Sequence, residues 1–154
     1  MFSAKNTTYY LFEECFHYGI GRYPFAAGSD FYAPAYGVFR RCVQRWDGSF
    51  THEPQASFCS YTTPHVYFQN CITLDMKDIK SADSSPGGIY IGAQGFYMVK
   101  HTDNIGMYGC IGLHLEGGGA FIEDGDWNNM ENIEVEDCVF WDLITDGDSE
   151  SRGS

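Results

Sequence analysis

The chain has 154 residues, 44% of them hydrophobic and 17% aromatic, which is enough apolar material for one folded domain and excludes a mainly disordered chain. Its formal net charge of -12 creates a field that repels phosphates and anionic lipids, so we expect neither nucleic acid nor a membrane surface as a partner. No apolar run approaches the ~20 residues that cross a bilayer, and the first residues lack the apolar stretch of a secretory signal. We expect a single domain over residues 1–148 and a flexible tail or cloning remnant over 149–154, with no compartment assigned.

Five of the six cysteines recur at a near-constant interval and reveal an internal repeat. The intervals between them are 27, 29, 39 and 28 residues, which fits one period with a single insertion of about ten residues. The residue three before each cysteine is apolar, the residue before it is polar or glycine, and the residue after it is apolar. These columns predict a short strand with one buried face, a tight polar corner and a second short strand, stacked coil on coil. The cysteines are Cys15, Cys42, Cys71, Cys110 and Cys138, and the columns are Phe12, Phe39, Phe68, Met107 and Val135; Glu14, Arg41, Asn70, Gly109 and Asp137; and Phe16, Val43, Ile72, Ile111 and Val139.

Two segments, Val66-Tyr67-Phe68-Gln69-Asn70-Cys71-Ile72 and Ile133-Glu134-Val135-Glu136-Asp137-Cys138-Val139, resemble coils of the right-handed parallel β-helix superfamily, the pectate-lyase-like fold. The resemblance covers roughly residues 9–143. It implies an all-β, right-handed parallel β-helix solenoid of about five coils, fewer than that family's enzymes usually have. Because the fold hosts lyases, hydrolases, esterases, epimerases and structural spikes, the resemblance implies a carbohydrate-active or carbohydrate-binding protein without naming a reaction.

The third strand of each coil is harder to place. We expect it at 31–32, 57–61, 89–91 with 96–99, and 120–122. Residues 19–35, 47–55 and 77–88 have the composition of loops. Since insertions at equivalent points of successive coils emerge on one side of a solenoid, we expect these loops to wall a ligand groove.

The cysteines admit more than one interpretation. The absence of a C-x-x-C pair argues against a zinc knuckle or a thioredoxin-like site. A ladder of buried free thiols that act as small hydrophobic residues is the favoured interpretation. Disulfides stay open as an alternative, because in-register neighbours ~4.8 Å apart fall within bridging range.

A sugar-stacking platform needs exposed aromatic rings on a rigid scaffold. Trp46 precedes a predicted turn at Asp47, and we expect its ring to be exposed there. Tyr32 and Tyr36 are the other candidate ligand-binding residues, with a polysaccharide as the candidate partner. The alternative is that these rings pack in the core or in loops.

Catalytic residues are not assigned by the sequence, and if the protein is an enzyme, a polysaccharide lyase or glycoside hydrolase is expected. Asp47, His52 and Glu53 share one predicted loop, and His101 and Asp103 lie two coils further on, so an acid–base pair could form across the groove. Solvated loop charges are the favoured interpretation. The Asn-Thr-Asp, Asp-Asp and Gly-His-Gly strings of polygalacturonase-like enzymes are absent.

Glu123, Asp124 and Asp126 have the oxygen density that Ca²⁺ requires. The first two positions of an EF-hand loop would, however, fall on Ala120 and Ile122, which have no side-chain oxygen. A solvated acidic turn is therefore favoured, and no cofactor is expected, with Ca²⁺ as the alternative. The basic residues Arg40, Arg41 and Arg45 either neutralise a bound uronate or line a charged outer face, and we favour the outer face.

A second functional class is a non-catalytic structural or interaction solenoid, for which the chain could be part of a longer protein. A stack of coils exposes strand edges at both ends, and bare edges pair readily with another chain. We therefore expect a homo-oligomer through the coil ends, formed around residues 9–16.

Overall fold

The computed structural model describes residues 1–5, 7–19, 23–28, 36–46, 56–76, 94–99, 103–115, 117–123 and 131–143. Every regular element in these ranges is a β-strand, and the fifteen strands form three parallel sheets of five strands each. This part of the chain contains no helix, and so no helix long and apolar enough to cross a membrane. The predicted all-β parallel β-helix of about five coils is confirmed.

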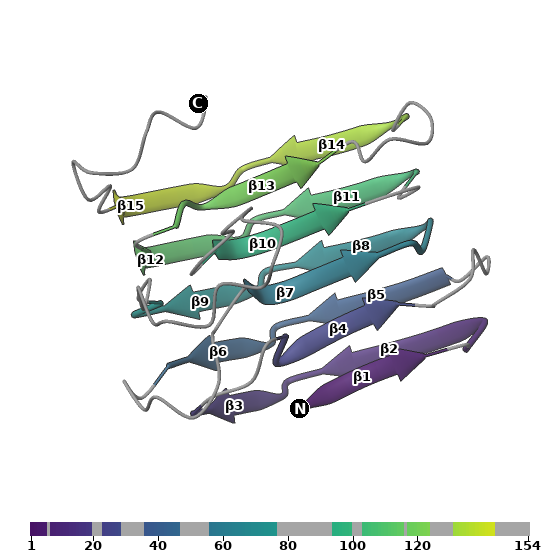
Figure 1. The fold of residues 1–154 in the computed structure, drawn as a ribbon, viewed down its shortest axis with the longest axis horizontal. Coiled ribbons are helices and arrows are strands. Elements are labelled where there is room, and N and C mark those ends of the chain that lie inside the picture. The colour runs from purple at the N-terminus through teal and green to yellow at the C-terminus, as the bar shows by residue number, and fades with distance from the viewer. Residues whose placement is uncertain are drawn as a thin grey trace, which may run out of the picture.

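Each of the five coils contributes one strand to each sheet (Figure 1). Sheet A contains β1 (Phe2–Lys5), β4 (Phe25–Gly28), β7 (Ala56–Tyr61), β10 (Gln94–Val99) and β13 (Ala120–Glu123). Sheet B contains β2 (Tyr9–Glu13), β5 (Tyr36–Arg40), β8 (Val66–Gln69), β11 (Ile105–Tyr108) and β14 (Ile133–Glu136). Sheet C contains β3 (Phe16–Tyr18), β6 (Val43–Arg45), β9 (Ile72–Leu74), β12 (Ile111–Leu115) and β15 (Val139–Leu143).

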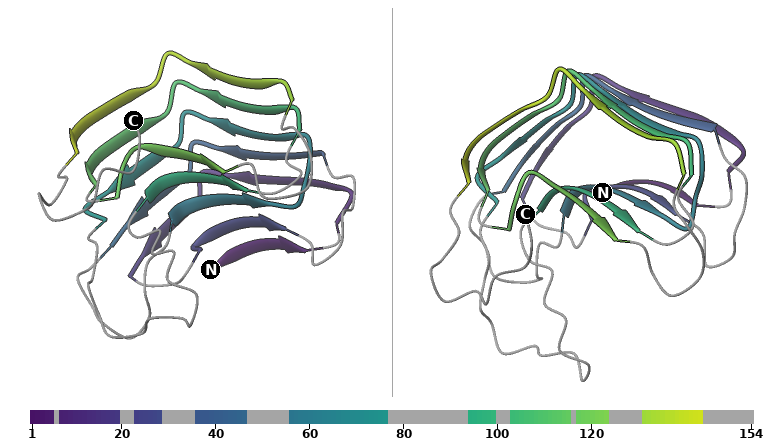
Figure 2. Two further views of the ribbon diagram at one scale, coloured as in Figure 1. Left: turned by 45° about the horizontal axis from the view of Figure 1, so that its top comes forward. Right: turned by 90° about the horizontal axis from the view of Figure 1, so that it is seen from above.

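Sheets B and C meet at a sharp corner, and sheet A crosses the open side between them (Figure 2). The corner lies at the residue before each ladder cysteine, as predicted. This residue has a left-handed backbone in every coil, with φ between 51° at Arg41 and 61° at Gly109. One left-handed residue between two extended strands turns the chain sharply, and Gly, Asn and Asp adopt that conformation most readily.

The five cysteines form one column, as the repeat predicts. Each backbone N–H of the residue after a cysteine donates to the carbonyl of the cysteine one coil earlier, as in Val43 N to Cys15 O at 2.8 Å. Each thiol from the second coil onwards also donates to a carbonyl of the preceding coil, as in Cys71 Sγ to Phe39 O at 3.3 Å. The thiols of this column form no disulfide, and the three central ones are buried. The favoured interpretation of the column is therefore confirmed.

Two ladders of stacked phenylalanines fill the interior. In sheet A the ring of Phe58 stacks between Phe25 at 4.8 Å and Phe96 at 5.0 Å between centroids. In sheet B the rings of Phe39 and Phe68 stack at 5.5 Å, and Phe68 meets Phe58 edge to face at 6.0 Å. Aromatic pairs in these geometries contribute about 0.5–1.5 kcal/mol beyond their burial. The in-register columns therefore stabilise the stacking of neighbouring coils.

The inner row of sheet C is polar in its first three coils. His17 Nδ1 lies 2.7 Å from Gln44 Oε1, and Gln44 Nε2 donates to the carbonyl of Gly19 at 3.3 Å. Thr73 follows in the same row and shares a hydrogen bond with the hydroxyl of Ser57. Because these buried groups have partners, the row is compatible with a stable core.

The strands of sheet A differ in part from their predicted positions. Strand β4 takes the sheet A position of coil 2, so the predicted loop at 19–35 contains a strand. The strand predicted at 31–32 lies outside the described residues. Strand β1 was not predicted. The strands at 57–61, 96–99 and 120–122 are confirmed, whereas 89–91 lies outside the described residues.

Candidate functional site

The outer face of sheet A changes in character from one end of the solenoid to the other. The parallel register places Ser3, Ala26, Cys59, Tyr97 and Phe121 in one outward column. The side chains are small in the first two coils and aromatic in the last two. In coils 3 and 4 this outer face is apolar and buried, with a cluster made of Ala56, Cys59, Tyr97 and Val99 and, packed against them, Tyr23, Tyr61 and Phe121.

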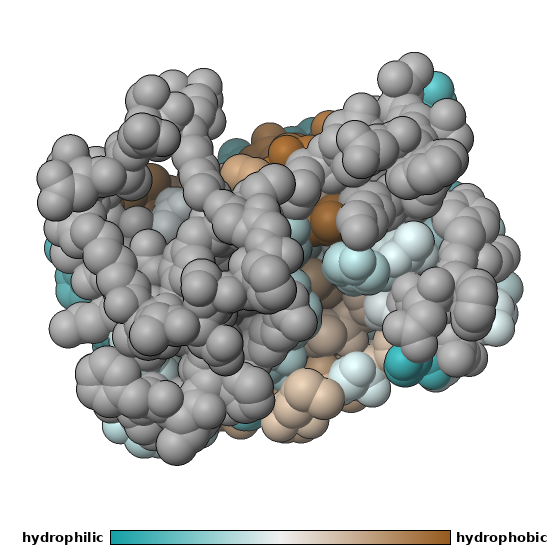
Figure 3. Space-filling view, in the orientation of Figure 1, coloured by the Kyte–Doolittle hydropathy of each residue, from teal (hydrophilic) through white to brown (hydrophobic). Residues whose placement is uncertain are grey.

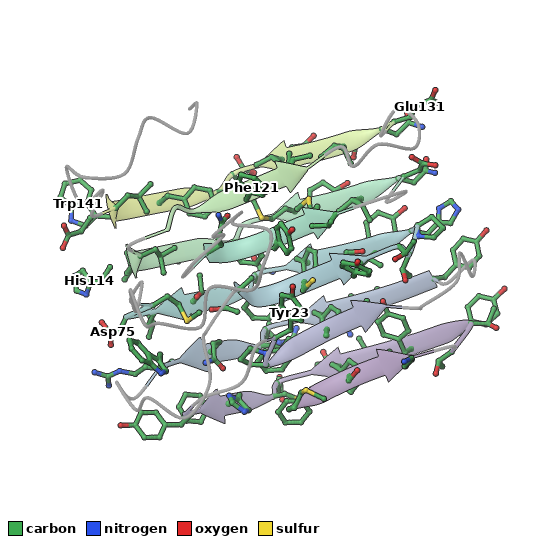
Figure 4. The ribbon with its side chains drawn as sticks, viewed as in Figure 1. Tyr23, Asp75, His114, Phe121, Glu131 and Trp141 are labelled. Carbon is green, nitrogen blue, oxygen red and sulfur yellow. The ribbon has the colours of Figure 1, made fainter. Side chains whose placement is uncertain are left out.

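A cavity of about 250 Å³ opens beside this cluster over the small residues. Tyr23 and Tyr61 stand at its sides, and Tyr23 stacks on Tyr97 with 6.3 Å between the ring centroids. Tyr97 in turn packs at 5.6 Å from Phe121, so a line of rings leads from the cavity to coil 5. Figure 4 shows Tyr23 and Phe121 on the front of sheet A, and Figure 3 shows brown and pale residues on the part of this front not drawn in grey. The cavity is lined by Ser3, Tyr23, Ala26, Ala27, Gly28, Cys59 and Tyr61.

The chemistry of the lining suits a small uncharged ligand with both apolar and hydroxyl groups. Among the described residues, no lining side chain carries a charge at neutral pH, and the two tyrosines and Ser3 bring hydroxyls to an otherwise apolar wall. The volume lies just below the ~300–1,000 Å³ of most small-molecule sites, so it matches a single sugar ring better than a long ligand.

Trp46 does not form the exposed platform that the sequence predicts. Its side chain is only 4% exposed and packs with Met76 and Leu115 against Phe140. The expectation of an exposed ring is wrong, because the residue that follows β6 directs its side chain into this apolar cluster. Its indole N–H has no hydrogen-bond partner there.

Tyr36 and Trp46 lie on different sheets and do not form a common site. Tyr36 is exposed on the outer face of sheet B, where its ring stacks at 5.5 Å on Tyr9 and at 4.4 Å on His65. The third predicted ligand-binding residue, Tyr32, lies outside the described residues.

Of the five catalytic candidates, only Asp103 lies in the described residues. Its carboxylate accepts a hydrogen bond from the backbone N–H of Glu131 at 3.2 Å, and its carbonyl accepts one from His65 N at 2.9 Å. It therefore joins the coils below and above at the corner between sheets A and B. Asp47, His52, Glu53 and His101, and the proposed calcium ligands Asp124 and Asp126, lie outside the described residues, as does the side chain of Glu123.

An acid–base cluster that the sequence analysis did not identify lies at the far end of sheet C. His114 Nδ1 donates to Asp75 Oδ1 at 3.1 Å, and its Nε2 lies 3.4 Å from Asp142 Oδ2. Asp75 Oδ2 also accepts from Arg45 Nε at 2.7 Å. Figure 4 shows Asp75 and His114 one above the other, with Trp141 above them. Asp75, His114 and Asp142 each lie four residues after a cysteine of the repeat. The repeat could therefore have identified them.

Burial raises the pKa of the Asp75 carboxyl, but the hydrogen bonds from His114 and Arg45 outweigh it, so that the pKa lies below its usual value. Both nitrogens of His114 face carboxylates. A general acid or base needs a nitrogen or oxygen that can reach the substrate. The cluster therefore fits a network of polar contacts that links coils 2 to 5 better than a catalytic site.

The two other arginines among the described residues are also paired between coils. Arg40 Nε lies 2.9 Å from Glu13 Oε1, and Arg41 contacts both Glu13 and Glu14 of the preceding coil. The hydrogen bond and charge of Arg40 lower the pKa of Glu13. These pairs agree with the favoured interpretation of a charged outer face.

No group of three or more His, Cys, Asp or Glu side chains among the described residues is arranged to hold a metal ion. Comparison of the chain with protein-family models, curated proteins and solved structures found no match. The parallel β-helix is thus assigned from the geometry of the coils alone.

Proposed function

We propose that the protein binds a neutral oligosaccharide in the cavity on the outer face of sheet A. The observation that carries this proposal is the pocket of about 250 Å³ between Tyr23 and Tyr61, floored by small residues. Sugar rings present flat C–H faces that pack on aromatic rings, and hydroxyls that hydrogen bond at the edges. An uncharged lining in a chain of net charge -12 favours a neutral sugar over an acidic one.

The resemblance of the coils to the pectate-lyase-like superfamily supports a glycan as the ligand class. It does not support a particular reaction, because that fold hosts many activities and a purely structural role. We propose binding without catalysis, since both nitrogens of His114 in the described carboxylate–histidine cluster face carboxylates and Asp75 also pairs with Arg45.

The test is an array of neutral and uronic-acid oligosaccharides, run together with assays for new reducing ends and unsaturated uronates. Tyr23→Ala removes one wall of the cavity and should weaken binding about fivefold, as expected for the loss of about 1 kcal/mol of ring contact. Tyr9→Ala is the matched control, because Tyr9 is an exposed tyrosine on the outer face of sheet B. The control should bind as the native protein does.

Ala26→Leu provides an independent variant that fills the cavity and leaves both tyrosines in place. It should abolish binding in the pocket while the circular dichroism spectrum stays unchanged. The proposal fails if no glycan binds, or if Tyr23→Ala and Tyr9→Ala have equal effects. If Tyr23→Ala leaves glycan binding unchanged but a chelator abolishes it, the result would instead support a Ca²⁺-bridged uronate and a lyase-like site.

A structural role as a stacking solenoid is the second candidate. Two residues of the inward columns, Ile122 and Val135, are 47% and 46% exposed in coil 5, whereas Phe2 and Phe12 in coil 1 are half-buried and pack edge to face at 6.0 Å. This difference favours coil 5 over coil 1 as the end on which another coil stacks. The exposed carboxylates of coil 5 oppose such stacking at neutral pH. They are Glu134, Glu136 and Asp137.

Light scattering as a function of pH tests this second candidate. Association through the ends should strengthen as the pH falls below about 4, where carboxylates lose their charge. Association through the ends should be abolished by Val135→Lys, which places a charge in the inward column of sheet B where coil 5 leaves it exposed. A strictly monomeric mass at every pH would contradict it.

A further inference from the structure

The outer face of sheet C is apolar along all five coils. Two columns of side chains point outward from this sheet, and nine of their ten members are hydrophobic. The one charged member, Arg45, already pairs with Asp75 at 2.7 Å. The columns are Phe16, Val43, Ile72, Ile111 and Val139, and Tyr18, Arg45, Leu74, Leu113 and Trp141.

Several of these side chains are largely uncovered. Phe16 is 59% exposed, Tyr18 60% and Trp141 69%. The outer face of sheet B differs, because it carries the ion pairs of Glu13 with the arginines of coil 2 and the exposed Glu134. Parallel sheets with apolar residues on both faces are normally covered on both faces. An exposed apolar patch of this extent therefore indicates an interaction surface.

We propose that the outer face of sheet C is the interface through which two copies of this chain associate. With ~200 Å² for an aromatic side chain, each of the three rings leaves roughly 120–140 Å² uncovered. Together with the aliphatic side chains, the face offers on the order of 700 Å² per copy, close to the ~800 Å² per partner of a standard stable interface.

Charge and shape both favour a second copy as the occupant. The chain has a net charge of -12, so two copies repel each other wherever carboxylates face one another. The two outward columns of sheet C contain no carboxylate, so this face permits close approach. Its rows also repeat at the strand spacing of ~4.8 Å, and a second copy has the same repeat, which allows the side chains of two such sheets to interdigitate. An anionic lipid surface would be repelled by the same net charge.

A concentration series by sedimentation velocity tests the proposal on the native protein. We expect a dimer whose dissociation constant decreases as NaCl is raised from 0.05 to about 0.5 M, because salt screens the repulsion and leaves apolar contact intact. A monomer at all concentrations and salt levels would overturn the proposal. So would a dimer that dissociates as salt is raised, because that dimer would depend on ionic contacts.

Variants in coil 3 separate this face from the coil ends. Leu74→Lys places a charge at the centre of the face and should weaken association at least tenfold. Tyr67→Lys, in the outward column of sheet B in the same coil, and Val135→Lys, in the inward column of sheet B in coil 5, should leave it unchanged. Should Leu74→Lys fail to fold, Trp141→Ser alters a ring that is already exposed and should weaken association several-fold. Dissociation by Val135→Lys or Tyr67→Lys with no effect at Leu74 and Trp141 would overturn the assignment.

Discussion

From the stacked phenylalanines we predict how much the central coil contributes to the free energy of unfolding. Phe58 is fully buried and has four aromatic neighbours, two stacked and two edge to face. Truncating such a ring costs its burial, leaves a cavity and removes both stacks. We expect Phe58→Ala to lower the free energy of unfolding by about 4–5 kcal/mol, near the upper end of the range for buried phenylalanine.

Urea denaturation followed by circular dichroism measures this loss. For a slope of about 2 kcal/mol/M, the midpoint should fall by about 2 M. Phe12→Ala is the matched variant, because Phe12 stacks in the sheet B ladder but is only half-buried in the first coil. It should lower the free energy of unfolding by about half as much. Phe58→Leu retains most of the volume and should cost less than about 2 kcal/mol. Equal losses for Phe58→Ala and Phe12→Ala would refute the argument that the central ladder dominates stability.

Three further predictions concern the thiols, the ion pairs of Asp75 and two glycines of sheet B. In the native protein a thiol reagent should react slowly, and only with Cys15 and Cys138 at the two ends of the column, because the other thiols are buried. After denaturation it should react with all six cysteines. More than two fast-reacting thiols in the native state would contradict the ladder. The lowered pKa of Asp75 means that its ion pairs stabilise the fold above its ordinary pKa and that this contribution is lost as the pH falls through the lowered value. Asp75→Asn should therefore lower the melting temperature at pH 7, and the decrease should shrink steadily as the pH is taken below about 4. An equal decrease at all pH values would contradict this. Gly37→Ala should destabilise the fold strongly, because the added Cβ would lie 1.8 Å from the inward ring of Tyr10. Gly106→Ala should cost less, because its nearest contacts are with the outward ring of Tyr108, which can move at the loss of its stack on Tyr67 and its hydrogen bond to Glu134. Similar urea midpoints for the two variants would count against that distinction.

The sequence could predict the inward columns because stacking gives every coil the same constraint. A residue three before each cysteine faces the interior in all five coils, so only apolar side chains fit, and the pattern is visible without a structure. The corner before the cysteine is equally constrained, since it requires a left-handed backbone. A residue type that recurs at the same place in every coil thus marks a position where contacts with the neighbouring coils restrict the choice of residue.

Strand β4 of sheet A was harder to predict because its sequence lacks a strand pattern. Strand β4 consists of Phe25 followed by two alanines and a glycine, which have low β propensity and no alternation of polar and apolar residues. It forms because β1 and β7 pair with it on both sides. Tertiary pairing here overrides local preference, and the predicted strand at 31–32 followed local preference instead.

Trp46 shows how one residue can depart from its column. The equivalent residues Asp75, His114 and Asp142 have φ between 54° and 58°, and their polar side chains meet outside the sheet. Trp46 does not adopt a positive φ, which is unfavourable for a bulky side chain, and its ring packs inward beside Leu115. Proximity in sequence to a turn was therefore a poor guide to its exposure.

The residues outside the repeat's constraint determine what this solenoid can bind. The described strands of successive coils stack in register, so the shape of an outer face there depends on side-chain size. On sheet A the outward column changes from Ser3 and Ala26 to Tyr97 and Phe121, which leaves a hollow over the first coils and a wall of rings over the last. On sheet C the outward columns stay apolar throughout, so that face is flat and favours another flat face. One backbone repeat thus carries two different surfaces, and the proposed ligand and the proposed second copy would occupy different faces.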